Sequence, residues 1–483
     1  MVGKEAYPTS SQKEFGEKCA VFGLYNRSDH LEVGRITADG LHALQHRGQE
    51  GSGIATSDGS TISIHKRKGL VKQVYDDEDP ASFNFDLLPG NMAIGHNRYA
   101  TSSKKSSDCH LQPVIDTEKK LTLVHNGNLP DTEKVEKFLE TYGINTSDLN
   151  DSEMMHAAIL HFKNIGASLD EAVVKAIPLF KGAFSLLAMD NKQIVVARDE
   201  RGLRPFSIGA LNGGYVFSSE TCALDAIGAR YIRDINPGEM ITANENGLRS
   251  FEHSRGEQRL DIFEFIYFAR PDSVLLGKSV LVARKNLGGM TARETSHSDA
   301  DIVINVPDSG TPGAIGYAQE SGIPYEEGLI KNRYTGRTFQ RPGQDRRVSE
   351  VLQKLNPVRE VLHNKRVIVV DDSIVRGTTS RELVRMLRNA GARKIHMRIT
   401  SPPVKFPDYY GIDTPDQRAL IGAHKSVSEI CEYIGADSLE FLSYDGMISA
   451  IGLPESMLST SCFTGDYPID IGKRREEIVY QKS

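Results

Sequence analysis

The sequence predicts an α+β first half followed by an α/β second half that contains a parallel sheet. The chain has 483 residues, which is too many for one hydrophobic core, so two domains plus appendages are expected. The first half contains short apolar runs with the spacing of hairpin strands, at 182–188 and 193–197. In the second half an apolar strand, a short loop and a helix follow one another twice, which is typical of parallel sheets.

Composition excludes several classes of protein. The 58 basic and 64 acidic residues give a net charge of −6, so no broad nucleic-acid-binding surface is expected. No apolar run approaches ~18 residues, which argues against a membrane span, and residues 1–18 lack the apolar core of a secretory signal. The five cysteines form no C-x-x-C pair and are too few for a disulfide framework. We therefore expect a cytoplasmic protein with no nucleic-acid and no membrane partner.

Beyond a polar leader, the first half predicts a β-rich body. The run CAVFGLY at 19–25 is apolar and β-prone, which indicates the first strand of a core. The segment LVHNGNL at 123–129 indicates a strand that runs into a turn, and NDSEMM at 150–155 indicates a helix start with Asp151 as N-cap. A further strand is expected at 214–218, and a helix follows it.

The second half predicts two strand–loop–helix units. The first has a strand at 302–306, the loop PDSGTPG and a helix at 314–320. The second, RVIVVDDSIVRGTT at 366–379, runs from a strand into a helix that Thr379 and Glu382 would cap as a capping box. Both loops follow buried parallel strands at their carboxyl ends, where open α/β sheets bind ligands. The remaining expected elements are helices at 279–287 and 426–434, strands at 395–400 and 439–443, and a helix C-terminal glycine at Gly391.

The loop at 371–379 carries groups suited to phosphate, sugar hydroxyls and Mg²⁺. Two adjacent carboxylates, Asp371 and Asp372, can hold Mg²⁺ or accept hydrogen bonds from paired hydroxyls. Small residues at the following helix N-terminus leave N–H groups free for a phosphate. The alternative is an ordinary turn with a solvated aspartate pair, but the complete string favours a ligand loop. It resembles the phosphoribosyl-pyrophosphate (PRPP) loop of type I phosphoribosyltransferases, which implies PRPP binding by Asp371, Asp372, Ser373, Arg376, Gly377, Thr378 and Thr379.

The same resemblance implies further ligand-binding residues in the second half. Ser309 of the first loop would join Asp371 and Asp372 in holding one Mg²⁺ per subunit. The basic stretch 331–347 on its own is a solvated charged loop. Its string KNRY-x-GRTF resembles the mobile loop that closes over PRPP in this family. That likeness implies PRPP contacts for Lys331, Tyr334 and Arg337.

Four segments of the first half are ordinary singly and informative together. On position alone Cys19 would be an inert buried residue, Arg98 in GHNRYATS an ion-pair partner, and Asn126-Gly127 a common turn. In this order the segments resemble the N-terminal-nucleophile, class II glutamine amidotransferase domain, an αββα sandwich. The resemblance implies Cys19 as nucleophile and Asn126 with Gly127 as oxyanion hole. It implies Arg98 and Asp151 as the clamp on the glutamine's α-carboxylate and α-ammonium.

This family needs its cysteine as the first residue, because the free α-amine serves as the base. The resemblance therefore implies that residues 1–18 are a propeptide, removed between Lys18 and Cys19. Ala20 stands where the family is expected to have glycine, and it is small enough to fit. The expected domains are 19–252 for the glutaminase and 253–470 for the phosphoribosyltransferase with its C-terminal helices, followed by a tail at 471–483.

The two halves in this order resemble the glutamine PRPP amidotransferase family. The resemblance implies that ammonia from glutamine passes internally to C1 of PRPP and displaces pyrophosphate. The products would be 5-phosphoribosylamine, pyrophosphate and glutamate, in the first step of de novo purine synthesis. It also implies a homotetramer with purine nucleotides as feedback inhibitors.

One group in this family carries a [4Fe–4S] cluster on four cysteines. Here Asp261, Asp408, Ser459 and Cys462 stand at the positions where those ligands are expected. Carboxylates and hydroxyls are poor ligands for such a cluster, so we expect no iron–sulfur cluster and a structural role for Cys462.

Three other functions are alternatives, and each can be told from the amidotransferase by a different feature. A salvage phosphoribosyltransferase would not need Cys19, Arg98, Asn126 and Asp151. A glucosamine-phosphate synthase or asparagine synthetase would share the first half but lack the PRPP loop. A non-catalytic PRPP or nucleotide sensor would bind nucleotides without releasing pyrophosphate.

Overall fold

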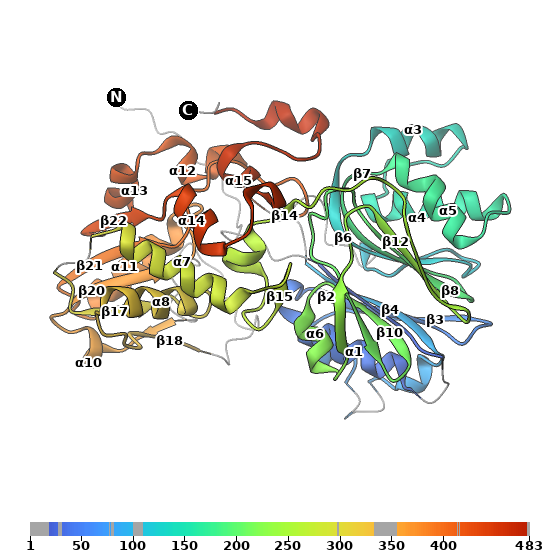
Figure 1. Cartoon of the computed structure of the whole chain (residues 1–483), viewed down its shortest axis with the longest axis horizontal. Helices are drawn as coiled ribbons and strands as arrows, with labels where there is room; N and C mark the ends of the chain where they lie inside the picture. The colour runs from blue at the N-terminus through green and yellow to red at the C-terminus, as the bar shows by residue number, and fades with distance from the viewer. Residues whose placement is uncertain are drawn as a thin grey trace.

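The structure is a computed structural model, and Figure 1 shows two bodies, one built around β1–β13 and the other around β17–β22. It describes residues 19–27, 31–76, 78, 82–99, 110–296, 299–332, 355–412, 414 and 416–480.

The first sheet of the first body is antiparallel and has β1 at its centre. Its strand order is β11-β9-β10-β1-β4-β2-β3. Because β1 runs antiparallel to β4, the start of β1 lies beside the end of β4, with Ala20 opposite Asn97. The strands are β1 Ala20–Tyr25, β2 Gly51–Ser57, β3 Ile62–Lys68, β4 Met92–Arg98, β9 Ser207–Leu211, β10 Gly214–Ser218 and β11 Arg230–Asp234.

The second sheet has the order β13-β12-β8-β7-β6-β5 and is also antiparallel. The predicted hairpin is confirmed as β7 and β8, which pair directly. The strands are β5 Val114–Ile115, β6 Thr122–Asp131, β7 Lys181–Met189, β8 Gln193–Arg198, β12 Glu239–Asn244 and β13 Gly247–Glu252.

The two sheets pack face to face between two layers of helices, which confirms the αββα sandwich. Alternation along the strands explains this, since Val21 faces the core between the sheets and Phe22 faces the outer helices. Helices α1 and α6 cover the first sheet, and α4 and α5 cover the second. The helices are α1 Val33–Ala43, α2 Val71–Val74, α3 Glu133–Thr141, α4 Asp151–Asn164, α5 Leu169–Ala176 and α6 Thr221–Ala226.

The second body is the predicted parallel α/β sheet. Its order is β17-β20-β21-β22, and each neighbouring pair is parallel. Helices α7 and α8 lie on the side of Val303 and Ile368, and α11 and α13 lie on the side of Ile304 and Val369. The elements are β17 Ile302–Asn305, β20 Arg366–Asp371, β21 Lys394–Ile399, β22 Ser438–Phe441, α7 Val280–Glu294, α8 Thr311–Ser321, α11 Thr378–Asn389 and α13 Val427–Ile434.

Two predicted helix caps were wrong. Helix α11 begins at Thr378, and its N-cap is Gly377 in the left-handed conformation (φ 74°) rather than Thr379. Helix α4 begins at Asp151, and Asn150 is its N-cap, with its side chain accepting a 2.9 Å hydrogen bond from the Glu153 N–H. A glycine cap suits a loop that must turn sharply, and an asparagine cap releases the neighbouring aspartate for other contacts.

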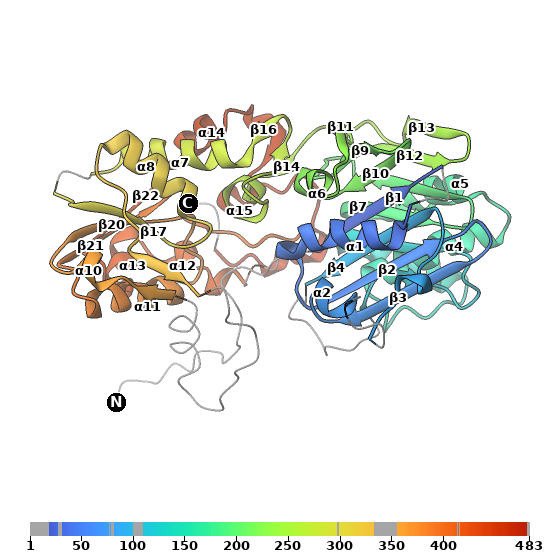
Figure 2. The ribbon, with the colours of Figure 1, turned by 90° about the horizontal axis from the view of Figure 1, so that it is seen from below.

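Short elements fill the junction between the two bodies, where β14 pairs with β23 and α15 lies close by (Figure 2). No described helix is long and apolar enough to cross a membrane. The short elements include η1 Gln45–Arg47, β14 Leu260–Asp261, the π-helix η5 Glu264–Phe268, β15 Val274–Leu275, β16 Lys278–Ser279, β18 Leu329–Lys331, β19 Leu355–Pro357, α10 Arg359–Leu362, α12 Ile421–His424, α14 Tyr444–Ile451, β23 Leu458–Ser459, α15 Ser461–Thr464 and η8 Gly472–Glu477.

Candidate active sites

Cys19 directly precedes the central strand β1, and its side chain is partly buried. Burial raises the pKa of the Cys19 thiol. A hydrogen bond from the Tyr99 backbone and the positive charge of Arg98 oppose this rise, and the negative charge of Asp151 adds to it. Arg98 and Asp151, predicted from separate segments, are therefore both close enough to act on the Cys19 thiol.

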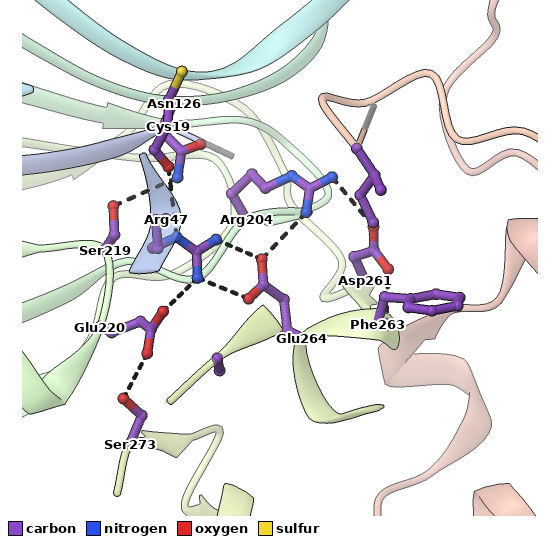
Figure 3. Close-up of polar contacts among 12 residues, drawn as sticks. Cys19, Arg47, Asn126, Arg204, Ser219, Glu220, Asp261, Phe263, Glu264 and Ser273 are labelled. Carbon is purple, nitrogen blue, oxygen red and sulfur yellow. Dashed lines mark hydrogen bonds and ion pairs between the residues drawn. The ribbon is translucent and has the colours of Figure 1, made fainter. Parts of the chain in front are cut away.

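The turn predicted at Asn126–Gly127 was wrong, because both residues lie inside strand β6, paired with Ser185 and Phe184 of β7. Gly127 has a φ of 150°, and a Cβ there would lie 2.0 Å from the Ala183 carbonyl oxygen, so only glycine fits. The buried Asn126 amide donates to the Ser219 hydroxyl at 3.4 Å. That hydroxyl accepts a 2.9 Å hydrogen bond from the Val21 N–H. Asn126 is thus tied to β1 two residues beyond Cys19 (Figure 3).

Local backbone contacts position Arg98 and Asp151. Asp151 accepts a 3.3 Å hydrogen bond from the Leu129 N–H, which ties the start of α4 to β6 two residues beyond Gly127. Arg98 ends β4, and Gly48 passes against it so closely that a Cβ on Gly48 would lie 2.8 Å from the Arg98 carbonyl carbon. This close approach fixes the main chain from which the Arg98 side chain starts.

In the second body the two predicted ligand loops touch. The Val306 N–H donates to the Val370 carbonyl at 3.0 Å, and a Cβ on Gly310 would lie 2.7 Å from that same oxygen. Burial raises the pKa of Asp372, and the Ser309 side chain opposes this rise, so the side chains of the two loops also lie close together. The Ser373 hydroxyl, which lies 2.7 Å from the Asp372 carboxylate, also opposes the rise.

The other PRPP-binding candidates surround these loops. Asp371 accepts a 3.0 Å hydrogen bond from the Asp372 N–H. Lys331, on β18, forms an ion pair with Asp308 of the first loop. Arg376, Gly377, Thr378 and Thr379 lie at the start of α11, where Gly377 supplies the turn. Tyr334 and Arg337 lie outside the described residues.

The donor set around Asp372 fits a hard cation that takes few protein ligands. Among the described residues no group of three or more His, Cys, Asp and Glu side chains could hold a metal ion. Mg²⁺ needs no such group, because it binds through one or two carboxylates together with water and substrate phosphates. Asp371, Asp372 and the Ser309 hydroxyl meet that requirement.

The four positions expected for cluster ligands do not fit an iron–sulfur cluster. Asp261 and Ser459 pair between β14 and β23, and the charges of Asp261 and Asp408 act with burial to raise the pKa of Cys462. Both aspartates form ion pairs with the buried Arg204, at 3.2 Å and 3.5 Å. The four positions therefore lie close together, but the two carboxylates there pair with the Arg204 guanidinium.

A buried ion network near Cys19 was not predicted from the sequence (Figure 3). Arg47 forms ion pairs with Glu220 at 2.5 Å and with Glu264 at 2.7 Å. Burial alone would raise the pKa of Glu264, but the charges of Arg47 and Arg204 lower it below its usual value. The sequence does contain charged residues in the segments HRGQE (46–50) and SSET (218–221). Nothing in the local sequence identifies the partners of these residues.

Known proteins with similar sequences cover nearly the whole chain. Residues 96–226 match a family model described as a glutamine amidotransferase domain. An amidophosphoribosyltransferase of Synechocystis is 46% identical over 474 residues, which is 96% of this chain and 94% of that protein. The amidophosphoribosyltransferase of Bacillus subtilis is 44% identical over 467 residues, which is 95% of this chain and 96% of that protein.

Solved structures agree with these matches. Glutamine PRPP amidotransferase from B. subtilis, complexed with ADP and GMP, superposes with a TM-score of 0.86 at 43% identity, covering 96% of this chain and 99% of that one. A structure described as the allosteric regulatory enzyme of purine biosynthesis gives a TM-score of 0.87, also at 43% identity, with 96% and 98% covered. The chain belongs to the amidophosphoribosyltransferase family, and its reaction is the glutamine-dependent amination of PRPP with which purine biosynthesis begins.

Proposed function

We propose that residues 19–252 release ammonia from glutamine at Cys19 and that residues 253–470 transfer it to PRPP. One observation carries the assignment of the first site. Cys19, the Asn126–Gly127 pair of β6, Arg98 and Asp151 come from four separate segments and lie near the start of β1. Each supplies a group that hydrolysis of an amide through a thioester requires.

The residues divide the first reaction among them. Once residues 1–18 are removed, the α-amine of Cys19 takes the thiol proton, because an α-amino group titrates near ~8. The thiolate attacks the carboxamide carbon, and the Asn126 amide and the Gly127 N–H donate to the oxyanion that forms. The C–N bond breaks and ammonia leaves with the proton. Water then hydrolyses the thioester to glutamate.

The glutamine clamp orients the substrate for this attack. The Arg98 guanidinium pairs with the α-carboxylate, and the Asp151 carboxylate accepts hydrogen bonds from the α-ammonium. Asn150 rather than Asp151 caps helix α4, so the Asp151 carboxylate is not needed for the capping box.

In the second site, Asp371, Asp372 and Ser309 would hold Mg²⁺, which when bound neutralises charge on the leaving pyrophosphate. The N–H groups of the loop ending at Gly377, Thr378 and Thr379 donate to phosphate oxygens. Ser373 and Arg376 line the same loop. Lys331 pairs with Asp308 of the neighbouring loop, and Tyr334 and Arg337 belong to the segment that resembles the family's PRPP-closing loop. Ammonia attacks C1 of the ribose as the bond to pyrophosphate breaks.

Purine nucleotides are proposed as feedback inhibitors of this chain. The B. subtilis relative was solved in complex with ADP and GMP. The loop at 371–379 offers the phosphate-binding groups that such nucleotides share with PRPP. We also propose that the protein assembles as a homotetramer.

The test is release of pyrophosphate from PRPP and Mg²⁺ with glutamine or ammonium chloride as the nitrogen donor. Cys19→Ala should lose the reaction with glutamine and keep the reaction with ammonium. Cys431→Ala, a control for a partly buried cysteine outside either site, should keep both. Wild-type protein that binds nucleotide but releases no pyrophosphate with either donor would support the sensor alternative instead.

Removal of the leader is tested on the same protein. Intact mass should show that glutaminase-active protein begins at Cys19. Full glutamine-dependent activity in protein that retains residues 1–18 would contradict the role of the α-amine.

A further inference from the structure

We propose that Glu264, which belongs to the second half of the chain, is a positioning residue for glutamine hydrolysis and acts through Arg47. The proposal rests on the proposed role of Cys19 as nucleophile. It assigns a task to a residue that touches neither substrate nor the reacting sulfur.

The Arg47 guanidinium connects Glu264 to the nucleophile's main chain. Arg47 is 2% exposed, and its two terminal nitrogens donate to the two Glu264 oxygens at 2.7 Å and 2.9 Å. Such a bidentate pair fixes the plane of the guanidinium. The remaining nitrogen, Nε, donates to the Cys19 carbonyl oxygen at 3.5 Å (Figure 3). Because the guanidinium is rigid, fixing its plane fixes the direction of this donor.

Glu264 also connects to the Asn126–Gly127 segment of β6 through a second guanidinium, that of Arg204. Arg204 donates to Glu264 at 3.2 Å and to the Tyr410 carbonyl oxygen at 3.2 Å. The loop that contains Tyr410 contacts β6 at Gly127 and Asn128. The Asn128 amide donates to the Tyr409 carbonyl at 2.7 Å, and a Cβ on Gly411 would lie 3.0 Å from Gly127.

The element that carries Glu264 also borders the proposed PRPP loop. Glu264 starts the π-helix η5, and helices of this kind are frequent at functional sites. Arg284 of α7 donates to the η5 carbonyls of Phe265 at 2.7 Å and, just beyond its end, of Ala269 at 2.9 Å. The charges of Arg284 and Asp372 act on each other. The π-helix therefore lies between the two proposed sites.

The charge balance of the network makes Glu264→Gln a suitable variant. Among its buried members, carboxylates outnumber guanidiniums, so removing one negative charge leaves Arg47 and Arg204 with other acidic partners. Glutamine has nearly the shape of glutamate but cannot accept a bidentate pair. The members are Arg47, Arg204, Glu220, Asp261, Glu264 and Asp408.

The experiment compares Glu264→Gln with wild type for kcat and KM with glutamine, for the ammonium-dependent rate, and for Tm. We expect kcat with glutamine to fall by about ten- to a hundredfold, since a small misplacement of a nucleophile is that costly. KM for glutamine should stay within about twofold, because the Arg98 and Asp151 clamp is untouched, and the ammonium-dependent rate should not change. Glu257→Gln is the matched control, because Glu257 also pairs with the first half (Arg201, 2.8 Å) but is exposed.

Two outcomes overturn the proposal, and a second variant tests it if the first does not fold. A folded Glu264→Gln protein with unchanged kcat for glutamine overturns it. A parallel fall of both reactions also overturns it, because a general structural role would affect both. If Glu264→Gln does not fold, Arg47→Lys replaces it as the test variant. Lysine keeps the positive charge but cannot form the bidentate pair with Glu264, so the rate with glutamine alone should fall. The proposed function fails separately, if Cys19→Ala retains the reaction with glutamine.

Discussion

Gly127 has a backbone conformation that leaves no room for a side chain. At its φ of 150°, a Cβ would lie 2.0 Å from the Ala183 carbonyl oxygen of the paired strand. Gly127→Ala must therefore shift β6 against β7 and move the N–H that is proposed to bind the oxyanion. Losing one such donor costs about 10²–10³ in rate, so we expect at least a hundredfold fall with glutamine and none with ammonium. Steady-state rates with both donors measure this.

Gly143→Ala separates backbone strain from steric overlap. Gly143 also has a positive φ, 76°, but nothing lies within 4 Å of an added Cβ. This variant should cost about 1–2 kcal/mol of stability and leave both reactions intact. If Gly127→Ala kept its rate with glutamine, the oxyanion assignment would be wrong.

The thiol of Cys19 offers a test of charge that does not need substrate. Burial raises its pKa, so the rate of alkylation by iodoacetamide should reach half its plateau at a higher pH than for a free cysteine. Arg98 lowers this pKa and Asp151 raises it. Arg98→Ala should therefore move the pH profile upward, and Asp151→Asn should move it downward. Shifts of the same sign in both variants would contradict the arrangement of these charges around Cys19.

Among the elements, the contact between the loops after β17 and β20 depends on Gly310. A Cβ there would lie 2.7 Å from the Val370 carbonyl, which is backbone and cannot move aside. Gly310→Ala should separate Ser309 from Asp372, raise KM for PRPP about tenfold or more, and slow the reactions with glutamine and ammonium equally. Gly322→Ala, in open space at the C-cap of α8, is the control and should leave KM for PRPP unchanged. If Gly310→Ala slowed only the reaction with glutamine, the defect would lie in the glutaminase site, and this prediction would be wrong.

Helices and strands could be predicted where the sequence pattern within the segment itself determines them. The apolar run before Asp371 and the helical spacing after Gly377 predicted β20 and α11, and both formed. The helix caps were less predictable, because a loop's path decides which polar residue becomes the cap. At α11 the chain needs a left-handed residue, and glycine adopts that conformation more easily than threonine.

At the scale of the whole molecule, the sequence indicated the site residues but not the network behind them. Cys19, Arg98, Asn126 and Asp151 stand in short recognisable segments, so their roles could be predicted from the resemblance. Arg47 and Glu264 are 217 residues apart, and their pairing depends on how the two bodies dock. No periodicity or spacing reports such a contact, since a buried arginine and an exposed one look alike in sequence.

Arg204 should contribute strongly to holding the two halves together. It is fully buried in the first half, and its acidic partners Glu264, Asp261 and Asp408 all belong to the second. Arg204→Met leaves these carboxylates buried with fewer cations, which costs about 3–5 kcal/mol. A marked fall in Tm is therefore expected. Arg201→Met, which breaks the exposed pair with Glu257, should change stability by no more than about 1 kcal/mol.

A second substitution tells lost charge balance from lost packing. Asp408→Asn keeps the oxygen that accepts from the Tyr410 and Ile412 N–H groups, at 2.9 Å and 2.7 Å, while it removes one buried negative charge. Added to Arg204→Met, it should therefore recover part of the lost Tm, because fewer carboxylates are then left without a cation. If the double variant is less stable than Arg204→Met alone, the arginine acts mainly through packing and its hydrogen bond to Tyr410. The junction would then not depend on the ion pairs that converge on Arg204.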